Sequence, residues 1–358
     1  MTLDSLSLYN FRSYTEARFT LEPGLNLVIG PNGIGKTNLL ESVQVLSITK
    51  SFRASDKELI HYGGSWYRIQ GKADNLVAEV RFDPSKPTLK KILLNQQPKR
   101  LETYLGSLPS VLFEPNSLFI VSGAPEERRR FLDMLLSSIK RPYLKSLLRY
   151  RRVLKQRNSL LRHGISPSLR EQIFAWDFKL TEFATEITEQ RHQFIEFLNT
   201  GASELYRDIA GKATSLRLEY REGFNRTEYA SQLLQQLTRG LERDAFYGFT
   251  SAGPHRDDIK IRFKDKPITA LASRGETRTV VLVIKLLELQ YLEKTLEKKP
   301  ILLFDDVFSE LDTARRQFLL ERITDYQAII TSTDTAGISK TLPRNHAIIK
   351  LKESESIS

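Results

Sequence analysis

Alternating apolar and polar positions characterise the beginning of the chain. Residues 3–8 alternate with a period of two, and parts of 67–72 and 76–82 do the same. Residues 89–99 hold the apolar run Ile92–Leu94 and then a turn-like Asn-Gln-Gln-Pro stretch, which is typical of a hairpin. Because a period of two places alternate side chains on one face of a strand, the pattern predicts a strand-rich first part.

The pattern changes to a helical period after Pro125. Residues 126–133 carry acids first and bases later, as the start of a helix does. Leucines between 143 and 162 recur at spacings that gather them on one side of a helix, and we expect a further helix over 169–199. Strand character returns at 216–220. The middle of the chain is therefore predicted to be mainly helical.

The last third alternates between strand-like and helix-like segments. We expect strands at 259–263, 301–304 and 328–331, and helices at 276–298 and 315–323. The strand that ends at residue 304 is apolar throughout, which is typical of a strand covered on both faces of a sheet. This alternation predicts a unit of the α/β class.

A phosphate-binding loop of the form G-x-x-x-x-G-K-[ST] follows the apolar run 25–29 and precedes a helix-like stretch. Glycines allow backbone N–H groups to close around phosphate oxygens, and the next helix points its positive end at the anion. We expect Lys36 to pair with the β- and γ-phosphates and the Thr37 hydroxyl to reach Mg²⁺. The eight residues of the loop are Gly30, Pro31, Asn32, Gly33, Ile34, Gly35, Lys36 and Thr37.

Two carboxylates, Asp305 and Asp306, come directly after the apolar strand 301–304. We expect Asp305 to hold Mg²⁺ through water and Asp306 to orient or deprotonate the attacking water, so that both acids and Lys36 form the catalytic set. Phosphoryl transfer needs such groups because the metal neutralises charge and the water must lie in line.

The long distance in sequence between Lys36 and Asp305 indicates an insertion between two halves of one sheet. The helical segment from about Pro125 to Tyr220 is the candidate insert. We expect three parts, namely the N-terminal half of an ATPase head, an inserted helical arm domain and the C-terminal half of the head, at residues 1–120, 121–245 and 246–358.

A second candidate anion site lies directly before the long helix. Ser273 offers a hydroxyl, Gly275 leaves backbone accessible, and a helix N-terminus follows. An ordinary N-cap at Ser273 or Thr277 would use the same residues. Ser309–Asp312 has two interpretations as well, a further N-cap or a loop that crosses between two nucleotide sites. A second anion site in one chain is redundant unless it covers the triphosphate of another subunit, so we expect a homodimer.

Basic residues give the chain a net charge of +11, and the segment from Arg128 to Arg162 carries an excess of the same size. Such a face attracts phosphates by releasing counterions, and we expect it to bind DNA through the backbone or shape and not through base sequence. A solvated helical face is the alternative. The candidates for DNA contact are Arg128, Arg129, Arg130, Lys145, Arg149, Arg151, Arg152, Lys155 and Arg157.

Composition excludes several classes of site. The chain has no cysteine, which excludes disulfides, thiolate metal sites and cysteine nucleophiles and permits a reducing compartment. Its first residues do not have the pattern of a secretory signal, and no apolar run approaches the roughly 20 residues that span a bilayer. We therefore expect a cytoplasmic protein with no membrane partner.

Four elements in this order resemble the ABC-type ATPases: the phosphate loop, S-x-G-x before a helix, an apolar strand with two acids, and S-x-L-D. The opening Y-N-F-R-S-Y narrows the resemblance to the SMC-like branch, where the arginine, here Arg12, contacts the nucleotide phosphates. Further stretches resemble the RecF family of bacterial recombination mediators and lie at 51–53, 112–115, 123–133, 154–158 and 253–258.

The resemblance implies an α/β fold, an ABC/SMC-type P-loop ATPase head with an inserted, mainly helical second domain. It implies ATP and Mg²⁺ as cofactors and an ATP-dependent homodimer in which each chain offers Ser273 and Gly275 to the partner's γ-phosphate. The implied partners are single- and double-stranded DNA at gap junctions, with RecR and RecO. The implied function is recombinational repair and replication, with assistance to RecA loading.

Four positions depart from related ATPases. Glu276 stands where glutamine is frequent, Glu114 lies about where a Mg²⁺-sensing glutamine is expected, Thr331 occupies the place of a switch histidine, and the second acid is Asp306 instead of glutamate. We therefore expect weak, DNA-stimulated ATPase activity with ATP binding as the main switch. The alternative function is the ATPase subunit of a membrane ABC transporter, which would need a membrane docking surface but no basic insert.

Overall fold

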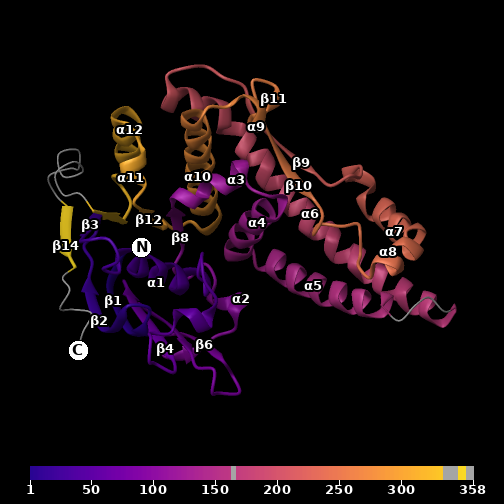
Figure 1. The fold of residues 1–358 in the computed structure, drawn as a ribbon, viewed down its shortest axis with the longest axis horizontal. Coiled ribbons are helices and arrows are strands. Elements are labelled where there is room, and N and C mark those ends of the chain that lie inside the picture. Colours follow the sequence, from indigo (N-terminus) through magenta and orange to yellow (C-terminus); the bar gives the residue numbers. More distant parts are fainter. Residues whose placement is uncertain (163–166, 334–345, 352–358) are drawn as a thin grey trace. The chain divides into compact units, whose positions relative to one another are not determined.

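The chain divides into two compact units in the computed structural model, which describes residues 1–162, 167–333 and 346–351 (Figure 1). The first unit comprises Met1–Ser117 and Glu288–Ser358, and the second comprises Leu118–Leu287. The second unit continues beyond the expected boundary at residue 245. The reason is that β10 (Asp258–Phe263) pairs along its whole length with β9 (Leu216–Arg221) of the insert.

An antiparallel sheet forms one layer of the first unit, in the order β2-β1-β4-β5-β6-β7. The tight turn Asn95-Gln96 joins β6 to β7, as the sequence predicts for a hairpin, and both turn residues have positive φ. The strands are β1 (Leu3–Phe11), β2 (Tyr14–Thr20), β4 (Tyr67–Ala73), β5 (Leu76–Phe82), β6 (Lys90–Leu94) and β7 (Gln97–Pro98).

A parallel sheet forms the second layer of this unit, in the order β14-β3-β13-β12-β8. The strands come from both ends of the chain, so the expected insertion between two halves of one sheet is confirmed. Their bounds are β3 (Leu25–Ile29), β8 (Ser110–Phe113), β12 (Ile301–Asp305), β13 (Ala328–Ser332) and β14 (His346–Lys350).

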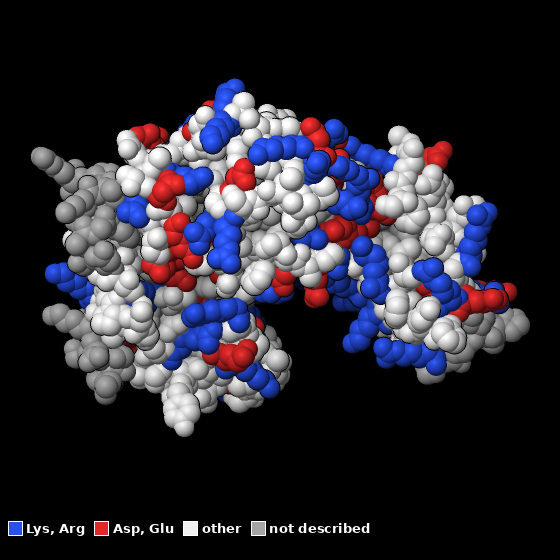
Figure 2. Space-filling view, turned by 45° about the horizontal axis from the view of Figure 1, so that its top comes forward, with Lys and Arg blue, Asp and Glu red and all other residues white. Residues whose placement is uncertain are grey.

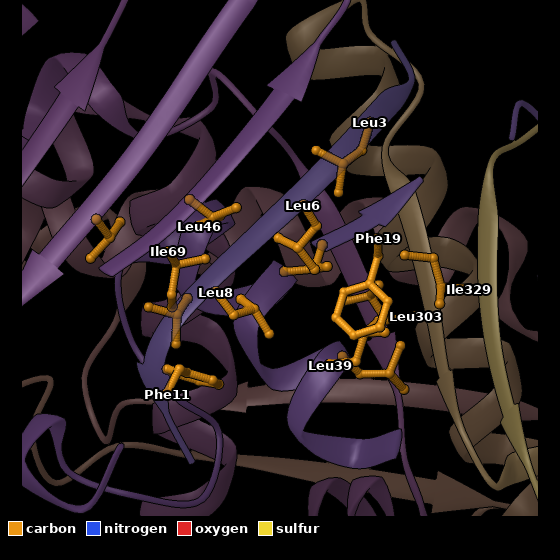
Figure 3. Packing of buried hydrophobic residues seen from close by; sticks show 14 of the residues in the cluster. Leu3, Leu6, Leu8, Phe11, Phe19, Leu39, Leu46, Ile69, Leu303 and Ile329 are labelled. Carbon is orange, nitrogen blue, oxygen red and sulfur yellow. The ribbon is translucent and has the colours of Figure 1, made fainter. Parts of the chain in front are cut away.

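Helix α1 (Lys36–Ile48) lies between the two sheets and contacts strands of both. Because a helix in this position has no solvent face, Leu39, Leu40 and Val43 are buried together with polar residues such as Glu41. Figure 3 shows the core around it, where Leu39 and Leu46 of α1 lie among side chains of both sheets. The shorter helices of the unit are η1 (Asp56–Leu59), α2 (Leu101–Tyr104), α11 (Val307–Glu310) and α12 (Thr313–Ile323), and η2 (Pro115–Leu118) ends at the boundary.

The second unit is mainly helical, with a three-stranded antiparallel sheet in the order β11-β10-β9. Helices α5 (Arg141–Leu161) and α6 (Pro167–Ala210) pack along each other, and α6 also packs on β9. Helix α10 (Arg274–Leu296) runs through the boundary between the units. The remaining elements are α3 (Phe119–Ser122), α4 (Pro125–Ile139), η3 (Arg226–Glu228), α7 (Tyr229–Arg239), α8 (Leu241–Tyr247), β11 (Lys266–Pro267) and α9 (Ile268–Leu271).

The long predicted elements are confirmed within a few residues at most of their ends, although α6 extends well past the expected end at 199. Several elements were not predicted, among them the strands β2, β8 and β14 and the helices α7 and α8. In the described parts of the chain, no helix combines the length and the apolar character needed to cross a bilayer.

Candidate functional site

The carboxyl edge of the parallel sheet gathers most of the residues that the sequence singled out. The phosphate loop follows β3, Asp305 ends β12, and Glu114 directly follows β8. Strand β13 lies between β3 and β12 in the sheet and carries Thr331 opposite Asp305. Because parallel strands end at the same edge, segments that are far apart in the sequence meet here.

Gly35 allows the loop to turn tightly into α1. Its φ is +114°, and a Cβ at this position would lie 2.7 Å from Ser13 Oγ and 2.8 Å from Tyr14 Oη. The Tyr14 hydroxyl also donates to the Gly35 carbonyl at 3.1 Å. The turn between β1 and β2 therefore supports the phosphate loop, and any larger residue at Gly35 would displace one of the two.

Lys36 lies across its own loop. Its Nζ donates to the carbonyls of Gly30 at 2.7 Å and Pro31 at 2.8 Å. Burial lowers the pKa of Lys36, while the nearby carboxylates of Asp306 and Asp305 act in the opposite direction. The ammonium group is thus held at the loop by weak neutral acceptors, which the stronger charge of a phosphate can replace.

One carboxylate oxygen of Asp305 accepts hydrogen bonds from two hydroxyl groups. Thr37 Oγ1 lies 2.8 Å and Thr331 Oγ1 lies 2.9 Å from Asp305 Oδ1. Thr331 in turn accepts the backbone N–H of Asp306 at 3.0 Å. The sequence offered Thr331 only as a departure from a histidine, but in the structure it positions both acids.

Asp306 adopts a backbone conformation that is rare for a residue with a side chain. Its φ is +52°, and it precedes the short helix α11. Such left-handed residues cost about 1–3 kcal/mol and are frequent at functional sites. The conformation is maintained by the hydrogen bond from its N–H to Thr331 and by a bond from Ser309 Oγ to its carbonyl at 2.6 Å.

The Thr37–Asp305 pair fits the requirements of Mg²⁺ at this position. Mg²⁺ prefers hard oxygen ligands and usually keeps several waters while binding one or two protein groups and substrate phosphates. A hydroxyl and a carboxylate oxygen 2.8 Å apart supply such a pair next to the phosphate loop. Within the described residues no group of three or more His, Asp or Glu side chains forms a complete metal cage.

A buried ion cluster around Glu41 lies on the first turns of α1. The Arg12 guanidinium donates to both oxygens of Glu41 at 2.8 and 2.9 Å, and Arg53 donates to Glu41 at 3.0 Å. Ser51 adds a hydroxyl, and Asn38 binds both Ser13 and Arg53. Burial raises the pKa of Glu41, but the bonds from Arg12, Arg53 and Ser51 outweigh it and leave the pKa below its ordinary value.

The cluster gives a structural role to two stretches for which the sequence alone offers only a family resemblance. Arg12 comes from the Y-N-F-R-S-Y opening and Arg53 from S-F-R, and both meet at Glu41. The structure places the Arg12 side chain on this carboxylate, and a contact between Arg12 and phosphate stays a prediction. Glu41 itself was missed, although an acid five residues after the loop lysine in an apolar helix is a signal that could have identified it.

Ser273 and Glu276 form a capping box at the start of α10. Ser273 Oγ accepts the Glu276 N–H at 3.2 Å, and Glu276 Oε2 accepts the Ser273 N–H at 2.9 Å. These bonds lower the pKa of Glu276, with a further contribution from Lys264. The carboxylate therefore has a structural role at the position where its presence was unexplained. Ser273 and Gly275 are exposed, and a Cβ on Gly275 would meet no heavy atom of the described chain within 4 Å.

The segment Ser309–Asp312 leads into α12. Asp312 is the N-cap of this helix, and its side chain accepts the Arg315 N–H at 2.9 Å. Ser309 belongs to α11 and is bonded to Asp306 as described above. The N-cap interpretation is thus present in the structure, and a role between two nucleotide sites stays a prediction.

The expectation for Arg157 as a DNA contact is corrected by its burial. Its side chain is 0% exposed and donates to Asp177, to Asp244 at 2.8 Å and to Thr250 at 2.9 Å. Arg128 is similarly committed, because it is 11% exposed and binds Asp258 through two bonds of 2.7 and 3.0 Å. Both arginines stabilise the fold of the second unit.

The other candidates reach the surface to different degrees. Arg129 is half-buried and donates to the Asp257 carbonyl at 2.7 Å, whereas Arg130 is exposed. Arg151 is 53% exposed and forms an ion pair with Asp133 at 2.9 Å. The exposed basic residues that share one face of α5, here called the α5 basic stripe, are Arg141, Lys145, Arg149, Arg152 and Lys155.

The α5 basic stripe follows from helical geometry. Its members are three or four positions apart, so they line one face, opposite the buried Tyr150, Val153 and Leu161. In Figure 2, Lys and Arg side chains follow the lower edge of the region that α5 to α8 form. A row of cations on one helix face is suited to successive phosphates of a nucleic acid backbone.

The stretch Gly253–Asp258 forms a turn before β10 and not a metal site. His255 accepts the Tyr150 hydroxyl at Nδ1 and contacts the Thr250 carbonyl through Nε2 at 3.0 Å. Burial lowers the pKa of His255 to about 4, with a smaller opposing effect from the bond to Thr250. A Cβ on Gly253 would lie 2.6 Å from Tyr150 Oη, so only glycine fits this approach. The histidine is therefore a neutral, structural side chain.

Known proteins provide an independent comparison. The chain matches the family described as RecF/RecN/SMC N terminal domain over residues 2–356. It is 35% identical to the DNA replication and repair protein RecF of Ruminiclostridium cellulolyticum over 98% of both chains. It is 37% identical to the protein of the same name from Leptospira interrogans, over 94% of this chain and 93% of the relative.

Solved structures show the same relationship. One is described as the recombination mediator protein RecF-ATPrS in the RecFOR pathway and has a TM-score of 0.88 at 29% identity, covering 98% of this chain and 96% of its own. The Smc head domain of Pyrococcus furiosus, with a TM-score of 0.51 and 16% identity, covers 94% of this chain and 91% of its own. The likeness to the Smc head concerns the fold alone, an ATPase head whose sheet is interrupted by an insert.

Proposed function

The chain belongs to the RecF family within the RecF/RecN/SMC group, and from this premise we propose that it is an ATP-controlled DNA-binding protein of recombinational repair and replication. One observation carries the proposal. The same chain combines a phosphate loop joined to an acidic strand end, through Thr37 and Asp305, with the exposed α5 basic stripe. The first arrangement suits a nucleoside triphosphate, and the second suits a polyanion that is much longer.

ATP binds at residues 30–37 in this proposal. Backbone N–H groups of the loop and the N-terminus of α1 face the phosphates, and Lys36 exchanges its carbonyl partners for phosphate oxygens. Thr37 and Asp305 hold Mg²⁺, which neutralises phosphate charge when it is bound. Solved RecF structures are described with ATP or an ATP analogue, which supports the assignment.

Asp306 orients and deprotonates the water that attacks the γ-phosphate. Its backbone is fixed by Thr331 and Ser309, which favours accurate positioning of a short side chain. The aspartate side chain is shorter than that of glutamate, so Asp306 reaches less far toward the attacking water. The Glu276 carboxylate is engaged in its own capping box. We expect slow hydrolysis that DNA stimulates, so that ATP binding is the switch and hydrolysis resets it.

ATP binding closes two chains into a homodimer. The exposed Ser273 and Gly275 at the N-terminus of α10 contact the γ-phosphate held by the partner chain. Neither residue is needed to fill space in its own chain, and the open surroundings of Gly275 leave room for a phosphate oxygen. The dimer then holds duplex DNA through the α5 basic stripes of both chains, and hydrolysis releases it.

The pathway partners follow from family membership. A solved relative is described in the RecFOR pathway, and we propose that this chain works with RecR and RecO at junctions of single- and double-stranded DNA to assist RecA loading.

Asp306→Asn tests the link between ATP and DNA. The variant should bind ATP but hydrolyse it at least about 100-fold more slowly, because the general base supplies roughly that factor. In fluorescence anisotropy with labelled duplex, we expect it to retain DNA after ATP addition for longer than the wild type. Lys36→Ala is the matched control, which should lose ATP binding and gain no affinity from ATP. Equal DNA affinity with and without ATP in the wild type would contradict the proposal.

A further inference from the structure

Three aromatic side chains at the end of α8 and just after it are exposed. Phe246 is 84%, Tyr247 is 59% and Phe249 is 39% exposed. Their ring centroids are 5.1 Å apart between Phe246 and Tyr247 and 5.8 Å apart between Tyr247 and Phe249. We call these three residues the aromatic cluster. Exposed rings in one group indicate a binding surface more than scattered single residues do.

The aromatic cluster is held on a rigid base. Arg157 joins Asp244 of α8 to Asp177 of α6, and the ion pair between Arg170 and Glu242 joins the same helices at the surface. Beneath them, Leu241 packs with Leu161 of α5 in a small apolar core. The backbone that carries the rings is therefore anchored before any ligand arrives, which reduces the entropy lost on binding.

Cations lie directly beside the rings. The Arg256 guanidinium lies 4.7 Å from the centroid of the Phe249 ring. Gly248, between Tyr247 and Phe249, has a φ of +71°, and a Cβ there would lie 3.6 Å from Arg162 Cγ. Arg162 is the C-cap of α5, so the helix that carries the α5 basic stripe ends at the aromatic cluster. Two arginines, Arg162 and Arg256, therefore lie next to the aromatic cluster at the end of α5.

We propose that the aromatic cluster stacks on unpaired bases of single-stranded DNA that continues from a duplex bound by the α5 basic stripe. All three side chains of the cluster are aromatic, and the Arg256 guanidinium lies beside one of them, Phe249. Proteins that bind single strands combine such stacking platforms with a basic track for the backbone. The inference rests on the proposed DNA binding and adds the residues that contact the unpaired strand.

The test compares three labelled DNAs by fluorescence anisotropy with the full chain and ATP. They are a blunt duplex, the same duplex with a thymine tail, and the same duplex with an abasic tail that keeps the phosphates but lacks bases. The wild type should bind the thymine-tailed duplex at least about tenfold more tightly than the other two, since stacking of a base contributes a factor of this order.

The double variant Phe246→Ala with Tyr247→Ala should lose this preference and keep the affinity of the wild type for blunt duplex. Phe174→Ala with Phe178→Ala is the control, because these are exposed rings of α6 outside the aromatic cluster, 52% and 61% exposed. A cluster variant that keeps the preference overturns the inference and assigns the rings to another occupant, such as a protein. An equal loss in the control, or equal binding of thymine and abasic tails by the wild type, overturns it as well.

Failure of the proposed function gives a different result. If the chain binds none of the three DNAs, DNA binding itself is wrong. If it binds blunt duplex with the expected dependence on the α5 basic stripe but shows no tail preference, only the stacking inference is wrong.

Discussion

At the scale of single residues, Thr331 connects the two acids of the proposed nucleotide site. It is 1% exposed, and its hydroxyl contacts Asp305 Oδ1 at 2.9 Å and the Asp306 N–H at 3.0 Å. Thr331→Val keeps the shape but removes both bonds. We expect an apparent Mg²⁺ affinity about 10–100-fold weaker in ATPase assays, as for other residues that orient metal ligands. Thr331→Ser should stay near the wild type, and an unchanged Mg²⁺ dependence in the valine variant would refute this role.

Glu41 is a second residue whose importance lies in its partners. Glu41→Gln leaves Arg12 and Arg53 near a neutral group, and we expect the free energy of unfolding to fall by about 3 kcal/mol. This is the low end for a broken buried pair, since Arg53 is 37% exposed. Urea unfolding at neutral pH measures the difference.

The difference in the free energy of unfolding between the wild type and Glu41→Gln should depend on pH, with a defined sign. The pKa of Glu41 in the folded protein lies below its ordinary value of 4.5. The ionised carboxylate therefore makes its full contribution to the free energy of unfolding above that pH. The contribution is lost as pH falls through the lower, folded-state pKa. The stability difference between wild type and Glu41→Gln should therefore shrink on acidification, and a difference that grows at low pH would be inconsistent with the ion cluster.

Residue types and their spacing predict the groups that we propose to bind phosphate and metal, but not the residues that support those groups. The phosphate loop, Asp305 and Asp306 have fixed spacing or follow a recognisable strand. Thr331 and Glu41 act through contacts between strands and loops that are distant in sequence, and no local pattern contains that information. Burial likewise decided the role of Arg157, since its charge is satisfied by Asp177 and Asp244, which lie 20 and 87 positions away.

At the scale of elements, α5 carries the proposed contact with the DNA backbone. Replacing Arg149, Arg152 and Lys155 by alanine should weaken duplex binding and reduce the slope of log affinity against log salt by up to about 3, close to one per phosphate contact. Alanine at Lys212, Arg217 and Lys260 removes equal charge from exposed positions elsewhere in the same unit. This control should keep the slope of the wild type, and equal effects of both triple variants would argue against α5.

Elements with a recognisable apolar pattern were predicted, and several other elements were missed. The long helices α5, α6 and α10 extend over enough residues to show a helical pattern, and the strands β3, β12 and β13 were recognisable as short, largely apolar runs. Helix α7 was missed although its buried Tyr229, Leu233 and Leu237 recur at helical spacing. Helix α8 is short and β14 is only partly buried at an edge of its sheet, so their patterns are weak. These weak elements matter, because α8 presents the aromatic cluster.

At the scale of the whole molecule, we propose that one chain holds only part of a working nucleotide site. The phosphate loop belongs to the first compact unit, while Ser273 and Gly275 belong to the second and are exposed. If ATP joins two chains, a substitution at Ser273 should separate ATP binding from dimerisation. A control for the capping box is needed, because loss of an N-cap lowers the free energy of unfolding by about 0.5–2 kcal/mol.

The most direct measurement is the molar mass of the chain in solution by light scattering, with and without ATP, for the wild type and three variants. We predict that the wild type and Ser273→Thr become dimers with ATP. Ser273→Asp retains an N-cap but repels phosphate, and Ser273→Arg blocks the contact. Both should bind ATP with near wild-type affinity and remain monomers. Full ATP-dependent dimerisation of Ser273→Arg and Ser273→Asp would contradict the proposal that Ser273 of one chain completes the nucleotide site of the other.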